Sequence, residues 1–189
     1  MSAHMQTKSK PQSRNAPETK ARILEAAEAI FAEKGYSQTG LRDIAARADV
    51  ATSLVIKYFD TKANLFEQAL QNALKISAME GSVERYGEIL VEAVTDPSVK
   101  IAAPAMIALS LGDDEAREIS SRVIRDDIIT RLSQWIGPPQ ARARAANFFL
   151  LSMGFAMFTR YLNVESSKAS GDATAKWVAR TLQDIISEE

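Results

Sequence analysis

The apolar positions from Gln38 to Lys62 predict two short helices separated by a tight turn. In the first helix, apolar residues recur at the i, i+3, i+4 and i+7 spacing that puts four side chains on one face, namely Leu41, Ile44, Ala45 and Ala48. The turn covers Asp49 to Ala51, and the second helix is expected from Thr52 to about Phe59. We expect Thr39 to cap the first helix and Thr52 the second, because a hydroxyl oxygen accepts a hydrogen bond from a free backbone N–H.

Longer amphipathic stretches flank this pair on both sides. A helix is expected from Pro17 to Gly35, since Pro and an acid favour a helix start and Gly favours its end. Its apolar face holds Ile23, Ala26, Ala27, Ile30 and Phe31. A fourth helix is expected to begin at Lys62 after a cap at Asp60-Thr61, and its apolar face continues through Leu65, Phe66, Ala69, Leu70, Ala73 and Leu74. This helix would join the N-terminal unit to the rest of the chain.

From Ser82 onward the pattern stays helical, and no alternating run predicts a strand. Pro and Gly breaks divide this part into helices expected over Ser82–Val94, Ser98–Leu111, Asp114–Ile136, Pro139–Leu162 and Ala173–Ser187. Pro104 falls inside the second of them and is expected to kink it. The chain is therefore predicted to be all-α, with about nine helices. Its predicted parts are a disordered tail (residues 1–17), a helix-turn-helix domain (18–66) and a helical bundle (67–189).

Two short helices joined by so tight a turn match a helix-turn-helix. Such a unit binds DNA by placing the outward side of its second helix in the major groove. The predicted base-reading residues on that side are Thr52, Ser53, Leu54, Ile56 and Lys57. Predicted phosphate contacts are Thr39, Arg42, Tyr58 and Lys62, the last at a helix N-terminus that favours anions. Lys20 and Arg22 lie on the polar face of the first expected helix, near its start.

The residues around these helices form a specific pattern: Thr39-x-x-Arg42-Asp43-Ile44-Ala45, then Ala48-x-Val50, then Lys57-Tyr58-Phe59-Asp60-Thr61-Lys62-x-x-Leu65. Over about Thr19 to Leu70 the chain resembles the DNA-binding domain of the TetR (tetracycline-repressor-like) family of bacterial regulators. Three positions depart from the family pattern: Asp49 replaces the usual Gly, Ala51 a capping Ser, and Ile56 a phosphate-binding Tyr. An exposed Ile cannot donate to a phosphate, so Ile56 is expected to touch a thymine methyl instead.

The resemblance implies a one-component transcriptional regulator, in the first instance a repressor. It also implies that the start of the first helix lies close to the DNA backbone, so that Lys20 and Arg22 are either phosphate contacts or solvated charges. It implies a homodimer that binds palindromic operator DNA, because two recognition helices about 34 Å apart meet successive major grooves. Regulators of this family generally hold a small-molecule effector in the C-terminal bundle. Effector binding would move the fourth helix, change that spacing and release the DNA, with the two affinities reciprocally coupled.

Apolar residues of the bundle either fill a core or line an effector cavity with Pro104. The candidate lining residues are Tyr86, Leu90, Met106, Ile107, Leu111, Ile124, Ile128, Phe148 and Phe155. Their spacing alone favours a filled core, whereas the resemblance favours a cavity. The sequence does not name the effector.

The expected helix Pro139–Leu162 is apolar nearly all round, and a helix of that kind must be buried on all sides. One face would meet its own bundle and another a second copy of the chain. The candidate dimer-interface residues on this helix and the last one are Phe149, Ser152, Ala156, Thr159, Trp177, Thr181 and Ile185. Paired across the dimer, the two helices would make a four-helix interface that resembles the one used in the family.

Composition narrows the function classes. The chain has no Cys, and its one His, His4, lies in the predicted tail, so the folded part lacks the usual zinc ligands and the commonest general base. We therefore predict no cofactor, no metal site and no catalytic residue, which argues against an enzyme. The acids at Asp113–Glu115 are expected to start a helix and those at Asp126–Asp127 to lie on a solvated face.

Charge is uneven along a chain whose formal net charge is -1. Residues 1–66 hold ten Lys and Arg against seven Asp and Glu, whereas residues 67–189 hold 13 against 17, which suits a DNA reader joined to a part that does not touch DNA. Nothing resembles a signal peptide, and the most apolar run, Phe148–Phe158, is too short to span a bilayer. A cytoplasmic protein without a membrane partner is expected.

Two other interpretations stay open at this point. In the first, the chain is a small-molecule-binding or catalytic helical bundle whose first sixty residues are only structural, although no nucleophile–base pair supports catalysis. In the second, it is a member of the family that has lost its effector and stays on DNA as a constitutive dimer. A cavity with polar anchors would separate an effector-responsive protein from the second of these.

Overall fold

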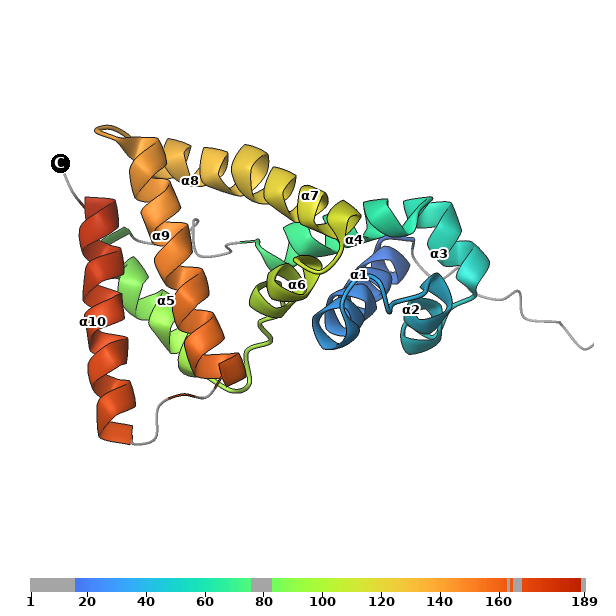
Figure 1. Ribbon diagram of the computed structural model, residues 1–189, viewed down its shortest axis with the longest axis horizontal. Coiled ribbons are helices and arrows are strands. Elements are labelled where there is room, and N and C mark those ends of the chain that lie inside the picture. Colours follow the sequence, from blue (N-terminus) through green and yellow to red (C-terminus); the bar gives the residue numbers. More distant parts are fainter. Residues whose placement is uncertain (1–15, 76–82, 163, 165–167, 188–189) are drawn as a thin grey trace, which may run out of the picture.

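The computed structural model describes residues 16–75, 83–162, 164 and 168–187 of the 189-residue chain. Every regular element in these ranges is a helix, as the apolar spacing predicts. Four N-terminal helices form one end of the molecule, and α10 lies at the opposite end (Figure 1). The predicted tail falls outside the described residues, except for Ala16 and Pro17, which begin α1.

The N-terminal helices are α1 (Ala16–Lys34), α2 (Leu41–Arg47), α3 (Thr52–Phe59) and α4 (Lys62–Ala73). Their positions agree with the prediction to within a residue or two. The predicted end of α1 is confirmed, since Gly35 has a φ of +76° and its N–H donates to the Phe31 carbonyl at 3.0 Å. The apolar faces of the four helices meet in one core that includes Ile23, Phe31, Ile44, Val55, Phe59, Leu65 and Phe66.

The predicted caps of α2 and α3 are wrong. Gly40 is the N-cap of α2, and its N–H donates to the Asp43 carboxylate at 3.1 Å. Thr39 lies one residue too early, so its buried hydroxyl donates instead to the Gly35 carbonyl at 2.6 Å and closes the turn after α1. Thr52 is the first residue of α3, and the N-cap Ala51 makes no side-chain hydrogen bond. The predicted cap of α4 is confirmed, because the Thr61 hydroxyl accepts from the Asn64 N–H.

The bundle contains α5 (Tyr86–Thr95), α6 (Ala103–Ser110), α7 (Asp114–Arg122), α8 (Ile129–Ile136), α9 (Ala141–Ala156) and α10 (Lys168–Ser187). A short 3-10 helix, Val83–Arg85, precedes α5. One π-helical segment, Val123–Ile128, joins α7 to α8, so the expected helix Asp114–Ile136 is continuous and the described residues hold nine helices. A second π segment, Met157–Leu162, extends α9 to the predicted end.

Two expected features of the bundle are corrected. The second bundle helix begins at Ala103 and not at Ser98, so Pro104 stands in its first turn and produces no kink. Proline is tolerated there because the first N–H groups of a helix have no partner within the helix. The last helix begins at Lys168, inside the stretch before Ala173 where a loop is expected.

Polar contacts join the N-terminal helices to the bundle. The Tyr36 hydroxyl donates to the Glu115 carboxylate at 2.5 Å, and the Ser37 hydroxyl donates to Asp113 at 2.6 Å. Burial, helped by Glu115, raises the pKa of Tyr36 above its ordinary value. Asp113 also caps α7 by accepting from the Ala116 N–H, as expected for an acid at a helix start. The turn after α1 is therefore tied to the start of α7.

Helix α4 leads from the helix-turn-helix into the bundle. It packs against α1 on one side and α7 on the other, and α1 also packs against α6. The predicted domain boundary between residues 66 and 67 falls inside α4, so that boundary stays a prediction. In the part of the chain that the structure describes, no helix is long and apolar enough to cross a membrane.

Candidate functional site

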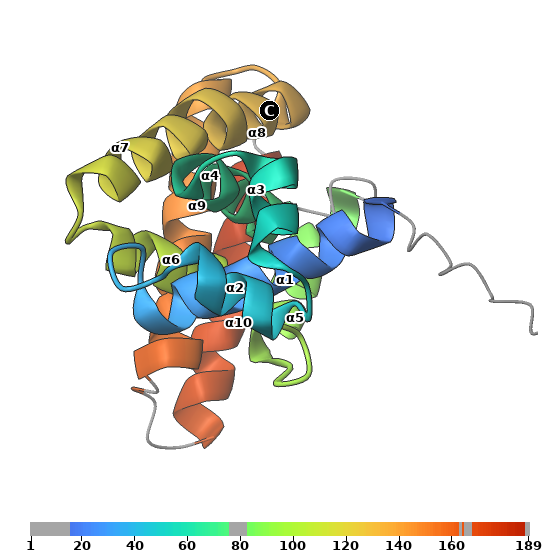
Figure 2. The same ribbon diagram turned by 90° about the vertical axis from the view of Figure 1, so that its right-hand side faces the viewer.

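Helix α3 presents its predicted outward side to solvent. Ser53, Ile56 and Lys57 are exposed, and Thr52 and Leu54 are half-buried. On the inward side, Val55 and Phe59 are fully buried in the core of the small domain. Figure 2 looks onto this end of the molecule, where α2 and α3 lie outermost. The helix can therefore enter a groove of its own width, and its base contacts stay a prediction.

The predicted phosphate contacts lie in different surroundings. Arg42 is exposed on α2, and Tyr58 is half-buried on α3. Thr39 is 3% exposed and gives its one hydroxyl proton to Gly35, which leaves no proton for a phosphate in this arrangement. The Lys62 ammonium donates to the Tyr36 carbonyl at 3.2 Å and lies 4.0 Å from the centre of the Tyr36 ring. Lys62 thus stabilises the turn after α1, with two of its three protons left for other partners.

A groove of about 570 Å³ runs between α1, α2 and α3. Its walls are Thr19, Arg22, Ala45, Ala46, Asp49, Val50, Ala51, Leu54 and Tyr58. The Arg22 guanidinium donates to the Asp49 carbonyl at 3.4 Å, and its Nε is buried without a partner in the described part of the chain. Lys20 lies over the Phe59 ring, 5.4 Å from its centre. Neither side chain is simply a solvated charge.

The departure at Asp49 has a structural consequence. Asp49 adopts a φ of +51°, in the left-handed region where Gly is unstrained and a side chain costs free energy. Asp49→Gly is therefore expected to raise the free energy of unfolding by up to about 1 kcal/mol, measured by urea denaturation. The control is Ala46→Gly on the exposed side of α2. There a glycine should lower the free energy of unfolding by about 1 kcal/mol, because glycine is unfavourable inside a helix. A loss of stability in both variants would contradict the strain at Asp49.

A largely apolar cavity of about 230 Å³ lies in the bundle between α4, α5, α6, α8 and α9. Its lining residues are Ala73, Leu74, Lys75, Leu90, Ala93, Val94, Val99, Lys100, Ile101, Ala103, Pro104, Ile128, Leu132, Phe148, Phe149, Ser152, Met153 and Ala156. Three of the predicted lining residues, Leu90, Ile128 and Phe148, are among them, and so is Pro104. The sequence reasoning missed Lys75 and Lys100, because each stands at the end of an expected helix.

The other predicted lining residues lie elsewhere. Tyr86, Met106, Ile107, Leu111, Ile124 and Phe155 are not on the cavity wall. Leu111 is 62% exposed, because α6 ends just before it. Tyr86 is buried against Trp135 and Phe148, with ring centres 4.8 and 5.6 Å apart. Burial raises the pKa of Tyr86 to about 12, and its hydroxyl has no partner in the described residues. Apart from Leu111, these residues are buried or half-buried, as the helical spacing of apolar residues predicts. That spacing does not distinguish a residue of a filled core from one that lines a cavity.

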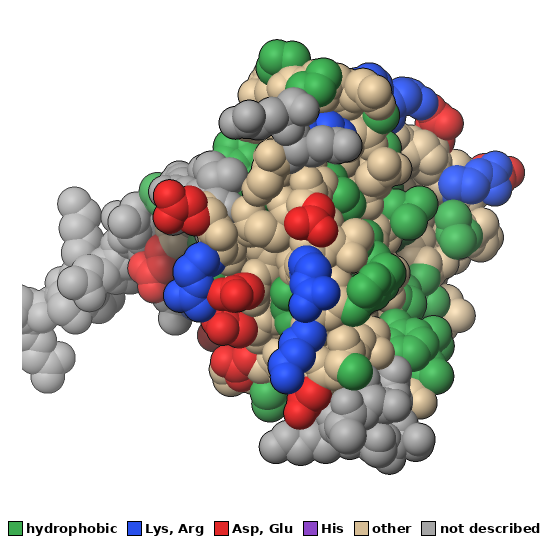
Figure 3. Space-filling view, turned by 90° about the vertical axis from the view of Figure 1, so that its left-hand side faces the viewer, with side chains coloured by type: hydrophobic (Ala, Val, Ile, Leu, Met, Phe, Trp, Pro, Cys, Tyr) green, Lys and Arg blue, Asp and Glu red, His purple; other side chains and the backbone are tan. Residues whose placement is uncertain are grey.

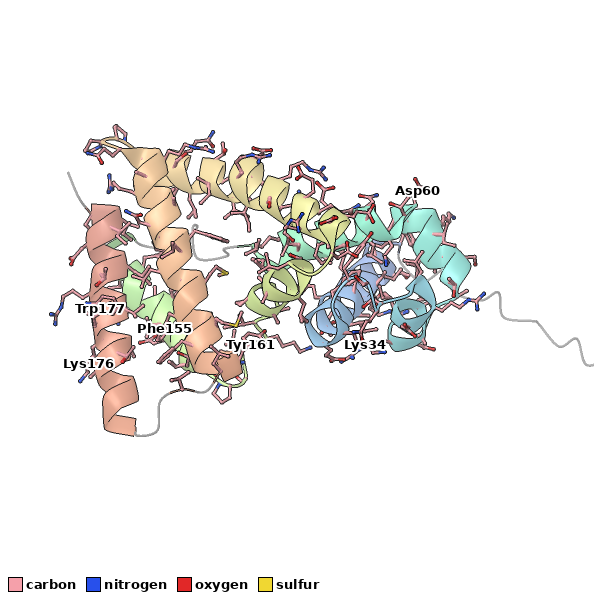
Figure 4. The ribbon with its side chains drawn as sticks, in the orientation of Figure 1. Lys34, Asp60, Phe155, Tyr161, Lys176 and Trp177 are labelled. Carbon is pink, nitrogen blue, oxygen red and sulfur yellow. The ribbon has the colours of Figure 1, made fainter. Side chains whose placement is uncertain are left out.

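Helices α9 and α10 make the face of the molecule farthest from α3. Figure 3 shows hydrophobic side chains gathered over one half of this face, beside a column of basic ones. Trp177 is 58% exposed there, and it lies with Lys176 on α10 in Figure 4. Thr159, Thr181 and Ile185 are half-buried. Leu150, 74% exposed, is absent from the prediction because a continuous apolar run does not show which of its members faces outward.

Three predicted dimer residues lie on the wall of this cavity. Phe149, Ser152 and Ala156 line it, and Ser152 and Ala156 are buried within one chain. The prediction is corrected for Ser152 and Ala156, whereas Phe149 is half-buried and stays a prediction for the dimer interface. The apolar run around α9 leaves its rotation undetermined, and only the neighbouring helices decide it. Within the described residues, no group of three or more His, Cys, Asp and Glu is arranged to hold a metal ion.

Comparison with known proteins agrees with this geometry. The family model "Bacterial regulatory proteins, tetR family" matches residues 23–69, and "Tetracyclin repressor-like, C-terminal domain" matches residues 84–186. An HTH-type transcriptional repressor of Mycobacterium tuberculosis is 34% identical over 90 residues, which cover 42% of this chain and 48% of that one. The chain thus matches about half of the length of this relative.

Two solved structures share the fold. A TetR-family regulator from Streptomyces coelicolor has 28% identity and a TM-score of 0.51, covering 94% of this chain and 99% of that one. NalD, the secondary repressor of the MexAB-OprM multidrug efflux pump in Pseudomonas aeruginosa, has 23% identity and a TM-score of 0.58, covering 89% and 96%. One family model matches the helix-turn-helix and the other more than half of the chain, and the protein therefore belongs to the TetR family of bacterial regulatory proteins.

Proposed function

We propose that this protein is a ligand-responsive transcriptional repressor that binds palindromic operator DNA as a homodimer. The observation that carries the proposal is the outward side of α3, where Ser53, Ile56 and Lys57 are exposed on a helix held by a buried inner side. Side chains of this kind read base edges in the major groove. Such a protein acts where the bacterial chromosome is, in the cytoplasm.

The dimer is proposed to form through the face of α9 and α10. Leu150 and Trp177 are large apolar side chains that stay mostly exposed in one chain, and such patches on a soluble protein mark contact surfaces. A two-fold pair of chains would present two α3 helices to a palindrome. The cavity between α4, α5, α6, α8 and α9 is the proposed effector site. It supports an effector-responsive protein over a constitutive DNA-bound dimer.

The first test is the selection of bound fragments from a random duplex library by the purified, effector-free protein at about physiological salt. Enrichment of a palindrome is expected, because two identical reading heads select an inverted repeat. A folded, dimeric protein that enriches no sequence would contradict the proposal and favour a helical bundle without a DNA role.

Lys57 is expected to read a base, because its side chain is exposed on the outward side of α3. Lys57→Ala should relax the base preference at one position of each half-site and weaken binding by about 1–3 kcal/mol for each base that Lys57 reads. Binding to a panel of single-base operator variants measures this. The charge-matched control is Lys34→Ala at the end of α1 (Figure 4), which should leave the preference unchanged. Uniform weakening on all operators would make Lys57 a phosphate contact instead.

Lys62 is expected to contact a DNA phosphate. One proton of its ammonium group is donated to the Tyr36 carbonyl, and the other two are available for the phosphate. Lys62→Ala should weaken binding to all sequences and lower the slope of log affinity against log salt by about one for each phosphate that Lys62 neutralises. The variant also removes a hydrogen bond and a cation–π interaction with Tyr36, so its thermal unfolding must be measured alongside. An unchanged salt slope would remove Lys62 from the DNA contacts and leave it a structural role.

A further inference from the structure

The effector cavity has an apolar interior and a basic rim. Lys75 and Lys100 are the only charged residues among the described residues that line it. The one other polar side chain, Ser152, is buried, and its hydroxyl already donates to the Phe148 carbonyl at 2.8 Å. A ligand that fills this space therefore meets hydrocarbon on nearly every side and positive charge at one end.

Lys100 binds α1 directly, whereas Lys75 is linked to α1 through Asn72 of α4. The Lys100 ammonium lies 2.5 Å from the Glu25 carboxylate, and this interaction lowers the pKa of Glu25. The Lys75 ammonium donates to the Asn72 side-chain oxygen at 2.8 Å, and the Asn72 amide donates to Glu28 at 2.5 Å. Glu25 and Glu28 stand one turn apart on α1. The helix that supports the helix-turn-helix is thus linked to the two cations at the mouth of the cavity.

We infer that the effector is a small amphipathic anion, with an apolar body in the cavity and a carboxylate that takes Lys100 from Glu25 of α1 and Lys75 from Asn72 of α4. This inference rests on the proposed function, because it names the ligand class and the coupling of the same site. A cavity of about 230 Å³ is smaller than the roughly 300–1,000 Å³ that hold drug-sized ligands. It therefore suits a short apolar chain or a single ring.

The exchange of partners is favourable for such a ligand. The Lys100 and Glu25 side chains are 83% and 64% exposed, and ion pairs of that kind contribute little to stability, so a ligand carboxylate competes at low cost. Charge-assisted hydrogen bonds to two ammonium groups are stronger than neutral ones. The apolar body adds affinity through its burial against residues such as Leu74 of α4 and Pro104 of α6.

The same exchange gives a route to DNA release. Without Lys100 nearby, the carboxylates of Glu25 and Glu28 lie one turn apart on α1 with less compensating charge, and like charges at that spacing repel. The ligand also touches α4 and α6, the two helices that make the most extensive contacts with α1. It thereby favours a state in which α1 has moved relative to the bundle, as differential binding to two states requires.

The test compares three ligands that share an eight-carbon chain: octanoate, octan-1-ol and octylammonium, all kept below micelle-forming concentrations. Binding to the effector-free, full-length protein is measured by calorimetry without DNA. Octanoate is expected to bind at least tenfold more tightly than octan-1-ol, and octylammonium more weakly than both. Equal affinity for octanoate and octan-1-ol, tighter binding of octylammonium, or no binding of octanoate would overturn the inference.

Variants separate the headgroup from the cavity. Lys100→Met and Lys75→Met are expected to lower the octanoate affinity a few-fold each and to leave octan-1-ol unchanged. Glu25→Gln removes the competitor for Lys100, so octanoate affinity should rise a few-fold. All three side chains are exposed, and circular dichroism verifies that the variants fold. Unchanged octanoate affinity in both lysine variants would refute the rim contact, and unchanged affinity in Glu25→Gln would refute the link to α1.

The outcome for DNA is measured separately, on the palindrome selected by the effector-free protein. Release of that DNA by octanoate, but not by octan-1-ol at equal concentration, is expected. If a palindrome is selected but no headgroup preference is found, the ligand class is wrong and the repressor function stands. If octanoate is preferred but no palindrome is selected, the ligand site stands and the proposed DNA role is wrong.

Discussion

Gly87→Ala is expected to lower the free energy of unfolding by about 3 kcal/mol, because α5 and α10 are in backbone contact at this position. A Cβ on Gly87 would overlap the Ala179 carbonyl oxygen and lie 3.0 Å from the Ala179 carbonyl carbon. Neither is the end of a flexible side chain, so the helices must separate. Separation would also break the hydrogen bond from the Gly87 N–H, in the first turn of α5, to the Gln183 side-chain oxygen at 3.2 Å.

Thermal and urea denaturation measure the effect, and Gly112→Ala is the matched control. Beyond its own chain neighbours, no heavy atom of the described residues lies within 4 Å of a Cβ built on Gly112, so this variant should stay within about 0.5 kcal/mol of the parent protein. Equal stability of both variants would show that α5 and α10 do not approach each other so closely. Because α10 carries part of the proposed dimer face, Gly87→Ala should also weaken self-association in sedimentation experiments.

Arg144→Met is expected to lower the free energy of unfolding by about 3 kcal/mol, since it removes a buried guanidinium that donates to three partly buried carbonyl groups. Arg144 is 5% exposed, and its guanidinium donates to Ile185 at 2.7 Å, Pro139 at 3.2 Å and Gly137 at 3.3 Å. These carbonyls belong to the end of α10 and to the loop between α8 and α9. One side chain therefore joins three segments, and methionine keeps its length without its five donors.

Arg142→Met serves as the control in the same turn of α9. Its side chain is exposed and makes one long hydrogen bond, 3.4 Å to the Arg125 carbonyl, so the expected change is within about 0.5 kcal/mol. The urea midpoint should fall for Arg144→Met with an unchanged slope of free energy against urea. A midpoint equal to that of Arg142→Met would mean that other donors or water satisfy the three carbonyls.

The helix-turn-helix was predictable because its information is local. The i, i+3, i+4 and i+7 pattern of Leu41 to Ala48, and the Thr61 cap before Lys62, act within one or two turns of helix, so neighbouring residues are enough to identify them. The incorrectly predicted caps of α2 and α3 also depend on local sequence, but each prediction was wrong by one position along the chain. Thr39 lies one position before the cap, where its hydroxyl bonds backward to Gly35.

In the bundle the sequence by itself determined which segments are helical and that several of them are apolar on more than one side. It did not determine their rotation, because a helix apolar all round has no preferred inward face until neighbours are in place. The packing of α9 against its neighbours in the tertiary structure decided that Phe149 and Ser152 line the cavity and that Leu150 is exposed. The contacts of Lys100 with Glu25 and of Asn72 with Glu28 were also decided only by the tertiary structure. The two residues of the first pair are 75 positions apart in the sequence and those of the second pair 44, so they meet only when the chain folds.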